Sequence, residues 1–220
     1  MLTIELINTN IPRLKLQDTV GKALQLINDF RVTHLPVVAD EKYLGLISEE
    51  DLLDADEEKM PIELMQETFI DAAVHDNEHF LTAVNFCNQH DSSVVPVINE
   101  ERELAGAITN TDLLKALGNF AGTNEIGGII VLEMERSQFA ISEISRLVES
   151  NDATILHLNT TVHPETGMLT VSIHVNKKEI ASIVSTFERY DYDVIYYFGN
   201  ENFENEIHTN YRHLMNYLDI

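Results

Sequence analysis

The chain contains one sequence pattern twice, in the same order and at almost constant spacing. Pro36 of the first copy corresponds to Pro96 of the second, 60 residues further on (96 − 36), and each proline opens a short run rich in valine. Gly45 corresponds in the same way to Gly106, but 61 residues further on (106 − 45). The extra residue falls in polar segments that predict hairpin turns. This duplication constrains the fold strongly, because it predicts two copies of a single structural unit.

Each copy predicts the same succession of elements, namely strand, helix, strand, turn, strand and helix. The valine-rich runs after Pro36 and Pro96 indicate strands in which a missing N–H group is tolerated. Apolar residues at helical spacing are Val20, Ala23, Leu24 and Ile27 in the first copy, and Leu81, Val84 and Cys87 in the second. A unit of about 60 residues buries too little surface to be stable alone. We therefore expect the two copies to pack together as one body.

The duplicated pattern is apolar-Pro-Val-apolar, a hairpin, and then Gly, two apolar residues, Ser or Thr, two further residues and Asp-Leu-Leu. It resembles the CBS-domain pair, with a first repeat over residues 1–57 and a second over residues 58–120. The resemblance implies a disc with two clefts, which bind adenine nucleotides or adenosyl compounds such as S-adenosylmethionine. Ligands of this kind regulate an attached domain or a partner enzyme, and no firmly bound cofactor is implied.

The same resemblance implies which residues contact a ligand. The ribose-contacting positions are Ser48, Asp51, Thr109 and Asp112, and the positions whose backbone flanks the base are Val37 and Val97. A structural interpretation of the Ser/Thr-x-x-Asp motifs is equally direct: a strand ends and a helix begins there, so the hydroxyl and the acid form a variant of the capping box. Both roles are compatible, because a carboxylate can accept hydrogen bonds from the two hydroxyls of a cis-diol.

Basic residues distinguish the two copies. Arg31 and His34 flank the Pro36 strand and are the predicted phosphate contacts, whereas the second copy has Asp91 and Val94 at these positions. Further basic residues, which we interpret as solvated surface, are Arg13, Lys15 and Lys22. A monophosphate or a charge-poor adenosyl ligand therefore fits this chain better than a triphosphate. The absence of a G-x-x-x-x-G-K-[ST] loop argues against a nucleotide hydrolase.

A different pattern follows the small, polar segment 118–124. Residues 126–199 alternate between strands and helices in the order βαββαβ, the ferredoxin-like arrangement, and resemble an ACT domain. That resemblance implies a small-molecule regulatory module that works as a dimer. The corresponding ligand turn, residues 135–139, has no glycine, and this argues against amino-acid binding because a Cβ atom prevents close backbone approach. The expected fold class is thus α+β throughout.

The central hairpin of this second region can be assigned a register. With Glu165 and Thr166 at the turn, residues whose numbers sum to 331 face each other. The register places Leu156 on an apolar face that is covered by helices. It places Ile155 and His157 on the opposite, polar face. The partner of His157 is then His174. Two imidazoles without further ligands do not predict a metal site.

Acidic residues dominate the composition, with 14 Lys and Arg against 37 Asp and Glu and a net charge of −23. This balance repels phosphate backbones and anionic lipid, so neither nucleic acid nor a membrane is an expected partner. The lone Cys87 cannot form an internal disulfide, and no apolar run approaches the roughly 20 residues of a membrane helix. The beginning of the sequence lacks the pattern of a secretory signal. These features predict a soluble, cytoplasmic protein.

The sequence predicts a binding protein and not an enzyme, because no nucleophile with an adjacent base and no paired catalytic carboxylates are recognisable. We expect a homodimeric regulatory protein, similar to bacterial acetoin-utilisation-type proteins, whose ACT-like domain mediates dimerisation or transmits the signal. The alternatives are a ligand-free dimeric assembly protein with side chains filling its clefts, an amino-acid sensor, and an unrecognised enzyme. Residues 200–220 carry an apolar stripe that predicts a C-terminal helical tail.

Overall fold

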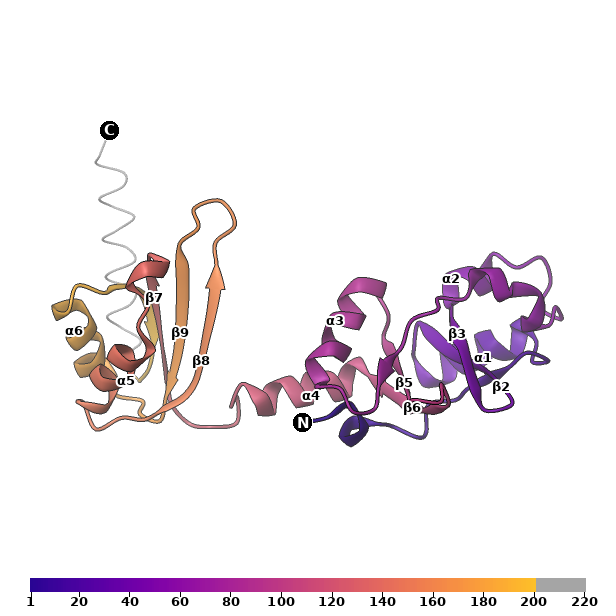
Figure 1. Cartoon of the computed structure of the whole chain (residues 1–220), viewed down its shortest axis with the longest axis horizontal. Coiled ribbons are helices and arrows are strands. Elements are labelled where there is room, and N and C mark those ends of the chain that lie inside the picture. Colours follow the sequence, from indigo (N-terminus) through magenta and orange to yellow (C-terminus); the bar gives the residue numbers. More distant parts are fainter. Residues whose placement is uncertain (201–220) are drawn as a thin grey trace. The chain divides into compact units, whose positions relative to one another are not determined.

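A computed structural model describes residues 1–200 of the chain (Figure 1). It comprises two compact units, Met1–Leu117 and a second unit that begins at Gly118. The predicted helical tail over residues 200–220 lies, apart from its first residue, outside the described residues. Within residues 1–200, no helix combines the length and the hydrophobicity that a membrane-spanning helix requires.

The first unit contains the sequence repeat as two copies of one sheet-and-helix motif (Figure 1). In each copy a short strand runs parallel to the central strand, which pairs on its other side with an antiparallel strand. The first copy consists of η1 (Thr3–Leu6), β1 (Leu14–Lys15), α1 (Val20–Phe30), β2 (His34–Ala39), β3 (Lys42–Ser48) and α2 (Glu49–Leu53). The second consists of η2 (Ile62–Thr68), β4 (Val74–His75), α3 (Phe80–His90), β5 (Val94–Ile98), β6 (Leu104–Thr109) and α4 (Asn110–Phe120). The predicted succession of elements is confirmed.

The first long helix of each copy ends in the same way. Arg31 follows α1 and Asp91 follows α3, both in the left-handed backbone conformation, with φ of 53° and 48°. A residue with a side chain adopts this conformation at some cost in free energy, and here it ends the helix. The chain then enters β2 or β5, whose valine-rich sequence favours a strand.

Corresponding residues of the two copies contact each other, as a two-fold arrangement requires. Thr33 N donates a hydrogen bond of 2.8 Å to Ser93 Oγ, and Ser93 N donates one of 3.0 Å to Thr33 Oγ1. Next to the hairpins, Lys42 pairs with Glu103, and its Nζ lies 3.0 Å from the Glu103 Oε1. The two copies therefore form one body, as expected.

The two copies also share their hydrophobic cores. Val94 and Ala107 of the second copy are buried in the cluster that surrounds α1. Conversely, Leu46 of the first copy is buried in the second cluster, with Val74 and Phe80. Fully burying an aliphatic side chain stabilises a protein by about 1.5–3 kcal/mol. Neither copy could keep this stabilisation without the other.

The second unit has the predicted order βαββαβ. Its elements are β7 (Gly128–Met134), η3 (Arg136–Gln138), α5 (Ile141–Glu149), β8 (Ile155–Val162), β9 (Leu169–Val175), α6 (Ala181–Arg189) and β10 (Asp193–Phe198). The strands form an antiparallel sheet in the order β10-β7-β9-β8. Ile144 of α5 and Phe187 of α6 are buried against Ile130 and Ile173 of the sheet, so both helices cover the same face.

The hairpin of β8 and β9 follows the predicted register over residues 157–162, whose partners have numbers that sum to 331. The register shifts before His157, however, and Ile155 pairs with Val175. The prediction that Ile155 lies on the polar face and Leu156 on the apolar face is therefore wrong: Ile155 packs against the core, and Leu156 is 38% exposed. A strand irregularity of one residue moves every side chain beyond it to the other face.

Candidate functional site

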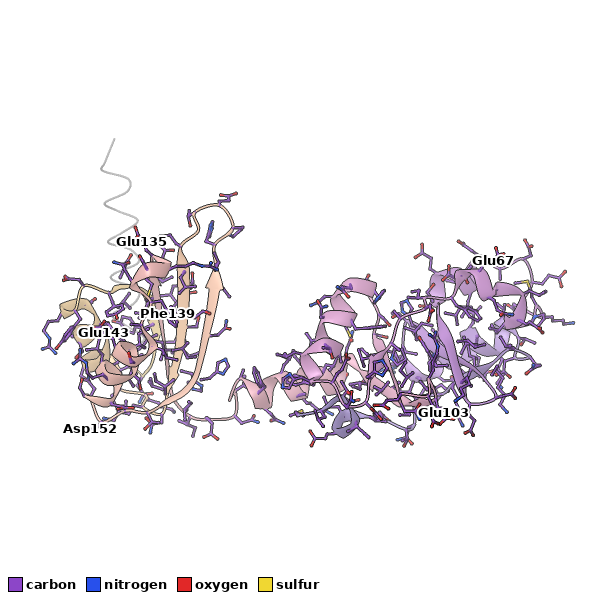
Figure 2. The ribbon with its side chains drawn as sticks, viewed as in Figure 1. Glu67, Glu103, Glu135, Phe139, Glu143 and Asp152 are labelled. Atoms are coloured by element: carbon purple, nitrogen blue, oxygen red, sulfur yellow. The ribbon has the colours of Figure 1, made fainter. Side chains whose placement is uncertain are left out.

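An open cleft of about 410 Å³ lies in the first unit, where the segment before β1 passes β6. This N-terminal cleft is lined by residues 9–13, by Pro36 of β2 and by residues 104–107 of β6. Asn8 N donates a hydrogen bond of 2.8 Å to Ala107 O and so holds the segment to β6. Glu103, labelled in Figure 2, directly precedes the β6 part of the lining. The volume is typical of ligand pockets, which measure about 300–1,000 Å³.

The segment before β1 supplies the polar side chains of the N-terminal cleft. Thr9 contributes a hydroxyl group, Asn10 an amide, and Arg13 the formal charge. Within residues 1–200, Arg13 forms no ion pair, whereas the Nζ of Lys22 lies 2.6 Å from Asp18 Oδ1. The remaining lining side chains, from β2 and β6, are apolar. A guanidinium that forms no such ion pair can bind an anionic group of a ligand, and the apolar side chains beside it can contact another part of the same ligand.

The two Ser/Thr-x-x-Asp motifs form the same hydrogen bonds at the starts of α2 and α4. Ser48 Oγ accepts from Asp51 N at 3.0 Å and donates to Asp51 Oδ2 at 2.5 Å. Thr109 Oγ1 accepts from Asp112 N at 3.2 Å and donates to Asp112 Oδ2 at 2.6 Å. These bonds are those of the capping interpretation. Each carboxylate keeps acceptor capacity for a further hydrogen bond.

The predicted phosphate contacts of the first copy have different surroundings. Arg31 is exposed at the end of α1, whereas His34 is only 7% exposed and its Nδ1 lies 2.8 Å from Thr33 Oγ1. Burial lowers the pKa of His34 below its ordinary value of 6.5, and the carboxylates of Asp51 and Asp91 oppose this only in part. The imidazole of His34 is therefore neutral at pH 7 and can act as a hydrogen-bonding group but not as a cation.

The sequence model of the CBS domain matches the chain twice, over residues 4–58 and 63–119. The matches span 55 and 57 residues, which is 112 of 220 and more than half of the chain. The chain belongs to the CBS domain family. Its first unit is thus a CBS domain pair, as the duplicated pattern indicated.

Solved structures resemble the chain over slightly more than half of its length. A CBS domain pair/ACT domain protein from Thermotoga maritima gives a TM-score of 0.50 at 23% identity, over 55% of this chain and 98% of the other. A protein assigned to acetoin utilization (AcuB) from Vibrio cholerae gives 0.48 at 21% identity, over 56% and 95%. CBSX2, solved in complex with AMP, gives 0.46 at 20% identity, over 54% and 97%. The first similarity shows the fold, and the ACT-like nature of the second unit stays a prediction.

The CBS-derived site residues do not line the N-terminal cleft. Val37 and Val97 are fully buried in the central strands of the CBS pair, and only the neighbour of Val37, Pro36, reaches the cleft. The other predicted residues, which also lie outside the lining, are Arg31, His34, Ser48, Asp51, Thr109 and Asp112. Their ligand-binding roles stay predictions.

Sequence comparison of the two CBS copies missed the segment that lines the cleft. Five residues separate Asn8, which bridges to β6, from Leu14 of β1 (14 − 8 − 1). In the second copy, only three separate Ile70, which bridges to β3, from Val74 of β4 (74 − 70 − 1). Extending the repeat alignment upstream of the helices would have revealed this difference in length.

In the second unit, the place of the predicted ligand turn is taken by η3. Glu135 N donates a hydrogen bond of 3.0 Å to Gln138 Oε1, and Phe139 packs against the core (Figure 2). His157 and His174 face each other on β8 and β9, as the register predicted. In the described part of the chain, no three His, Cys, Asp or Glu side chains come together in a group that could hold a metal ion.

Proposed function

We propose that this chain is a cytoplasmic regulatory protein whose CBS domain pair binds an adenine nucleotide or another adenosyl compound, such as S-adenosylmethionine. The N-terminal cleft carries the proposal, because it has the volume of a ligand pocket and combines apolar side chains of β2 and β6 with the charge of Arg13, which forms no ion pair within residues 1–200. Pairs of CBS domains are generally regulatory and often bind adenosine ligands, which supports the same ligand class.

In this proposal the second unit is an ACT-like domain that mediates dimerisation or transmits the signal to a partner. Its helices cover one face of the sheet, and the other face has exposed apolar or aromatic side chains, among them those of Ile129, Tyr196 and Phe198. Exposed apolar patches are typical of contact surfaces. This face also supports the second candidate function, a ligand-free dimeric assembly protein.

A thermal-shift experiment distinguishes the two functions. A ligand that binds only the folded state stabilises it by about 2.7 kcal/mol at a concentration of 100 times Kd. For a chain of 150–250 residues, each kcal/mol of stabilisation raises the melting temperature by about 2–4 °C. We expect a shift with AMP or S-adenosylmethionine, and a smaller one with ATP. If millimolar AMP, ADP, ATP and S-adenosylmethionine, with and without magnesium, all leave the melting temperature unchanged, the assembly function is favoured.

The carboxylates of Asp51 and Asp112 can be tested separately from their capping role. Asp→Asn at either position keeps much of the cap geometry but removes the charge that best accepts from a ribose diol. We expect folding to survive in both variants and nucleoside affinity to fall in the one whose carboxylate contacts the ribose. The matched controls are Ser48→Ala and Thr109→Ala, each of which should cost about 1 kcal/mol of stability through the lost cap. Parent-like affinity in both Asn variants would mean that the motifs are caps alone.

A further inference from the structure

The two copies of the CBS pair can be aligned residue by residue through their strand pairing. Tyr43 at the start of β3 pairs with Val38, and Leu104 at the start of β6 pairs with Ile98, 60 residues after Val38 (98 − 38). Tyr43 and Leu104 are therefore equivalent. Leu104 lines the N-terminal cleft. Tyr43 therefore lies at the position where the pair would have a second cleft, equivalent to the N-terminal cleft.

The position of this second cleft is filled by side chains of the chain itself. Tyr43 is only 1% exposed, and its hydroxyl donates a hydrogen bond of 2.7 Å to Ala72 O in the segment before β4. Arg102 pairs with Asp71 of the same segment, and its Nε donates to Tyr43 O at 3.2 Å. The residue equivalent to Arg102 in the first copy is Glu41 (102 − 61), which forms no ion pair within residues 1–200.

The segments that precede β1 and β4 also differ in length. The segment between Asn8 and Leu14 has two more residues than the one between Ile70 and Val74, and its residues line the open cleft. The shorter segment brings Ala72 O within hydrogen-bonding distance of the tyrosine hydroxyl. A leucine at the equivalent position has no group to make such a bond.

The charged residues also distinguish the N-terminal cleft from the position of the second cleft. In the N-terminal cleft, the guanidinium of Arg13 forms no ion pair within residues 1–200. At the position of the second cleft, by contrast, the guanidinium of Arg102 forms an ion pair with Asp71. An anionic ligand would have to displace a buried tyrosine ring and compete with Asp71 for the exposed guanidinium of Arg102, whereas it could enter the N-terminal cleft without either cost.

We infer that each chain binds a single adenosyl ligand, in the N-terminal cleft, and that Tyr43 and the Arg102–Asp71 pair close the equivalent second site. This inference rests on the proposed function and defines its stoichiometry and location. The two CBS copies thus have different tasks: the segment before the first copy contacts the ligand, and the corresponding segment of the second copy binds the chain's own tyrosine.

Isothermal titration calorimetry of the full chain with AMP, ATP and S-adenosylmethionine tests the inference. We expect one binding site per chain for whichever probe binds. Leu104→Tyr places in the open cleft the side chain that fills its counterpart, and should weaken binding about tenfold or more. The matched control is Leu114→Tyr, which adds the same ring at a 70% exposed position of α4 and should bind like the parent.

A second variant protects the test against a folding defect in Leu104→Tyr. Ala105→Trp adds a large ring at an exposed position of the lining, and it should weaken binding while the melting temperature stays near that of the parent. Two sites per chain, or parent-like affinity in the folded Leu104→Tyr and Ala105→Trp variants, would overturn the inference and leave the proposed function intact. Absence of binding by the parent to all three probes would contradict the proposed function itself, and with it the inference.

Discussion

Arg13 is the charged residue in the lining of the N-terminal cleft, so we expect it to set which ligand charge the cleft prefers. We expect Arg13→Gln to weaken AMP binding about tenfold and to leave adenosine binding nearly unchanged, because a hydrogen bond to a charged group contributes about 1.5–3 kcal/mol and an exposed group less. Calorimetric titration with both ligands measures the difference. The control is Lys22→Gln, which removes a cation that is paired with Asp18. Equal losses for AMP and adenosine would contradict a charge-specific role.

We expect His34 to couple folding to pH. Burial lowers its pKa in the folded chain, whereas the unfolded chain has the ordinary value of 6.5. The unfolded state therefore takes up the proton first, so the stability present above pH 6.5 is lost as the pH falls towards the folded-state pKa. Between about pH 7.5 and about pH 5, we expect the free energy of unfolding to fall more for the parent than for His34→Gln. Denaturant titrations across this range measure it, and identical pH profiles would show that His34 does not contribute.

At the scale of elements, β3 and β6 each contain a glycine where another segment crosses closely. A Cβ atom at Gly45 would lie 2.8 Å from the Cβ of Phe69 and 3.1 Å from the carbonyl oxygen of Ile70. At Gly106 its closest contact would be the side-chain Cγ2 of Ile7, at 2.3 Å, which a change of the Ile7 χ1 angle can move, whereas the backbone oxygen of Asn8 lies at 3.9 Å. The repeat therefore has glycine at both crossings, but the two positions differ in how well they tolerate a Cβ atom.

We expect Gly45→Ala to lower the free energy of unfolding by about 1–3 kcal/mol, because backbone and Cβ atoms must move apart. Gly106→Ala should cost less, since a side-chain rotation relieves its contact. Urea denaturation of both variants measures the difference, and the parent is the common reference. A cost for Gly106→Ala as large as that for Gly45→Ala would show that the Ile7 side chain is as rigid as the backbone.

The elements differ in how far the sequence could predict them. Helix starts at Ser48 and Thr109 follow from local patterns, because a capping hydroxyl and its acid lie three residues apart. The shift before His157 could not be predicted, since the spacing of a hairpin does not reveal an extra residue inside a strand. The resemblance implied clefts but their lining could not be predicted, because the N-terminal cleft combines residues 9–13 with residues 104–107, and only the folded repeat brings them together.

At the scale of the whole molecule, the exposed sheet face of the second unit bears on assembly. Ile129, Tyr196 and Phe198 are 41%, 46% and 56% exposed there, on neighbouring strands β7 and β10. Ile129 pairs directly with Phe198 in the sheet, so these side chains form one patch. A two-fold axis through such a patch would place the same residues of two chains against each other.

We expect the full chain to be a homodimer through this face and Ile129→Asp to make it monomeric, because a carboxylate opposite its own symmetry mate is repelled and desolvated. Each chain carries a net charge of −23, so dimerisation should strengthen with salt, which screens the repulsion between chains. Sedimentation equilibrium at micromolar protein, in low and in moderate salt, measures both effects. Leu114→Asp, at a 70% exposed position of α4 in the CBS pair, is the matched control and should stay dimeric. A monomeric parent would contradict dimerisation, whereas a dimer that survives Ile129→Asp but is lost in Leu114→Asp would place the interface on the CBS pair.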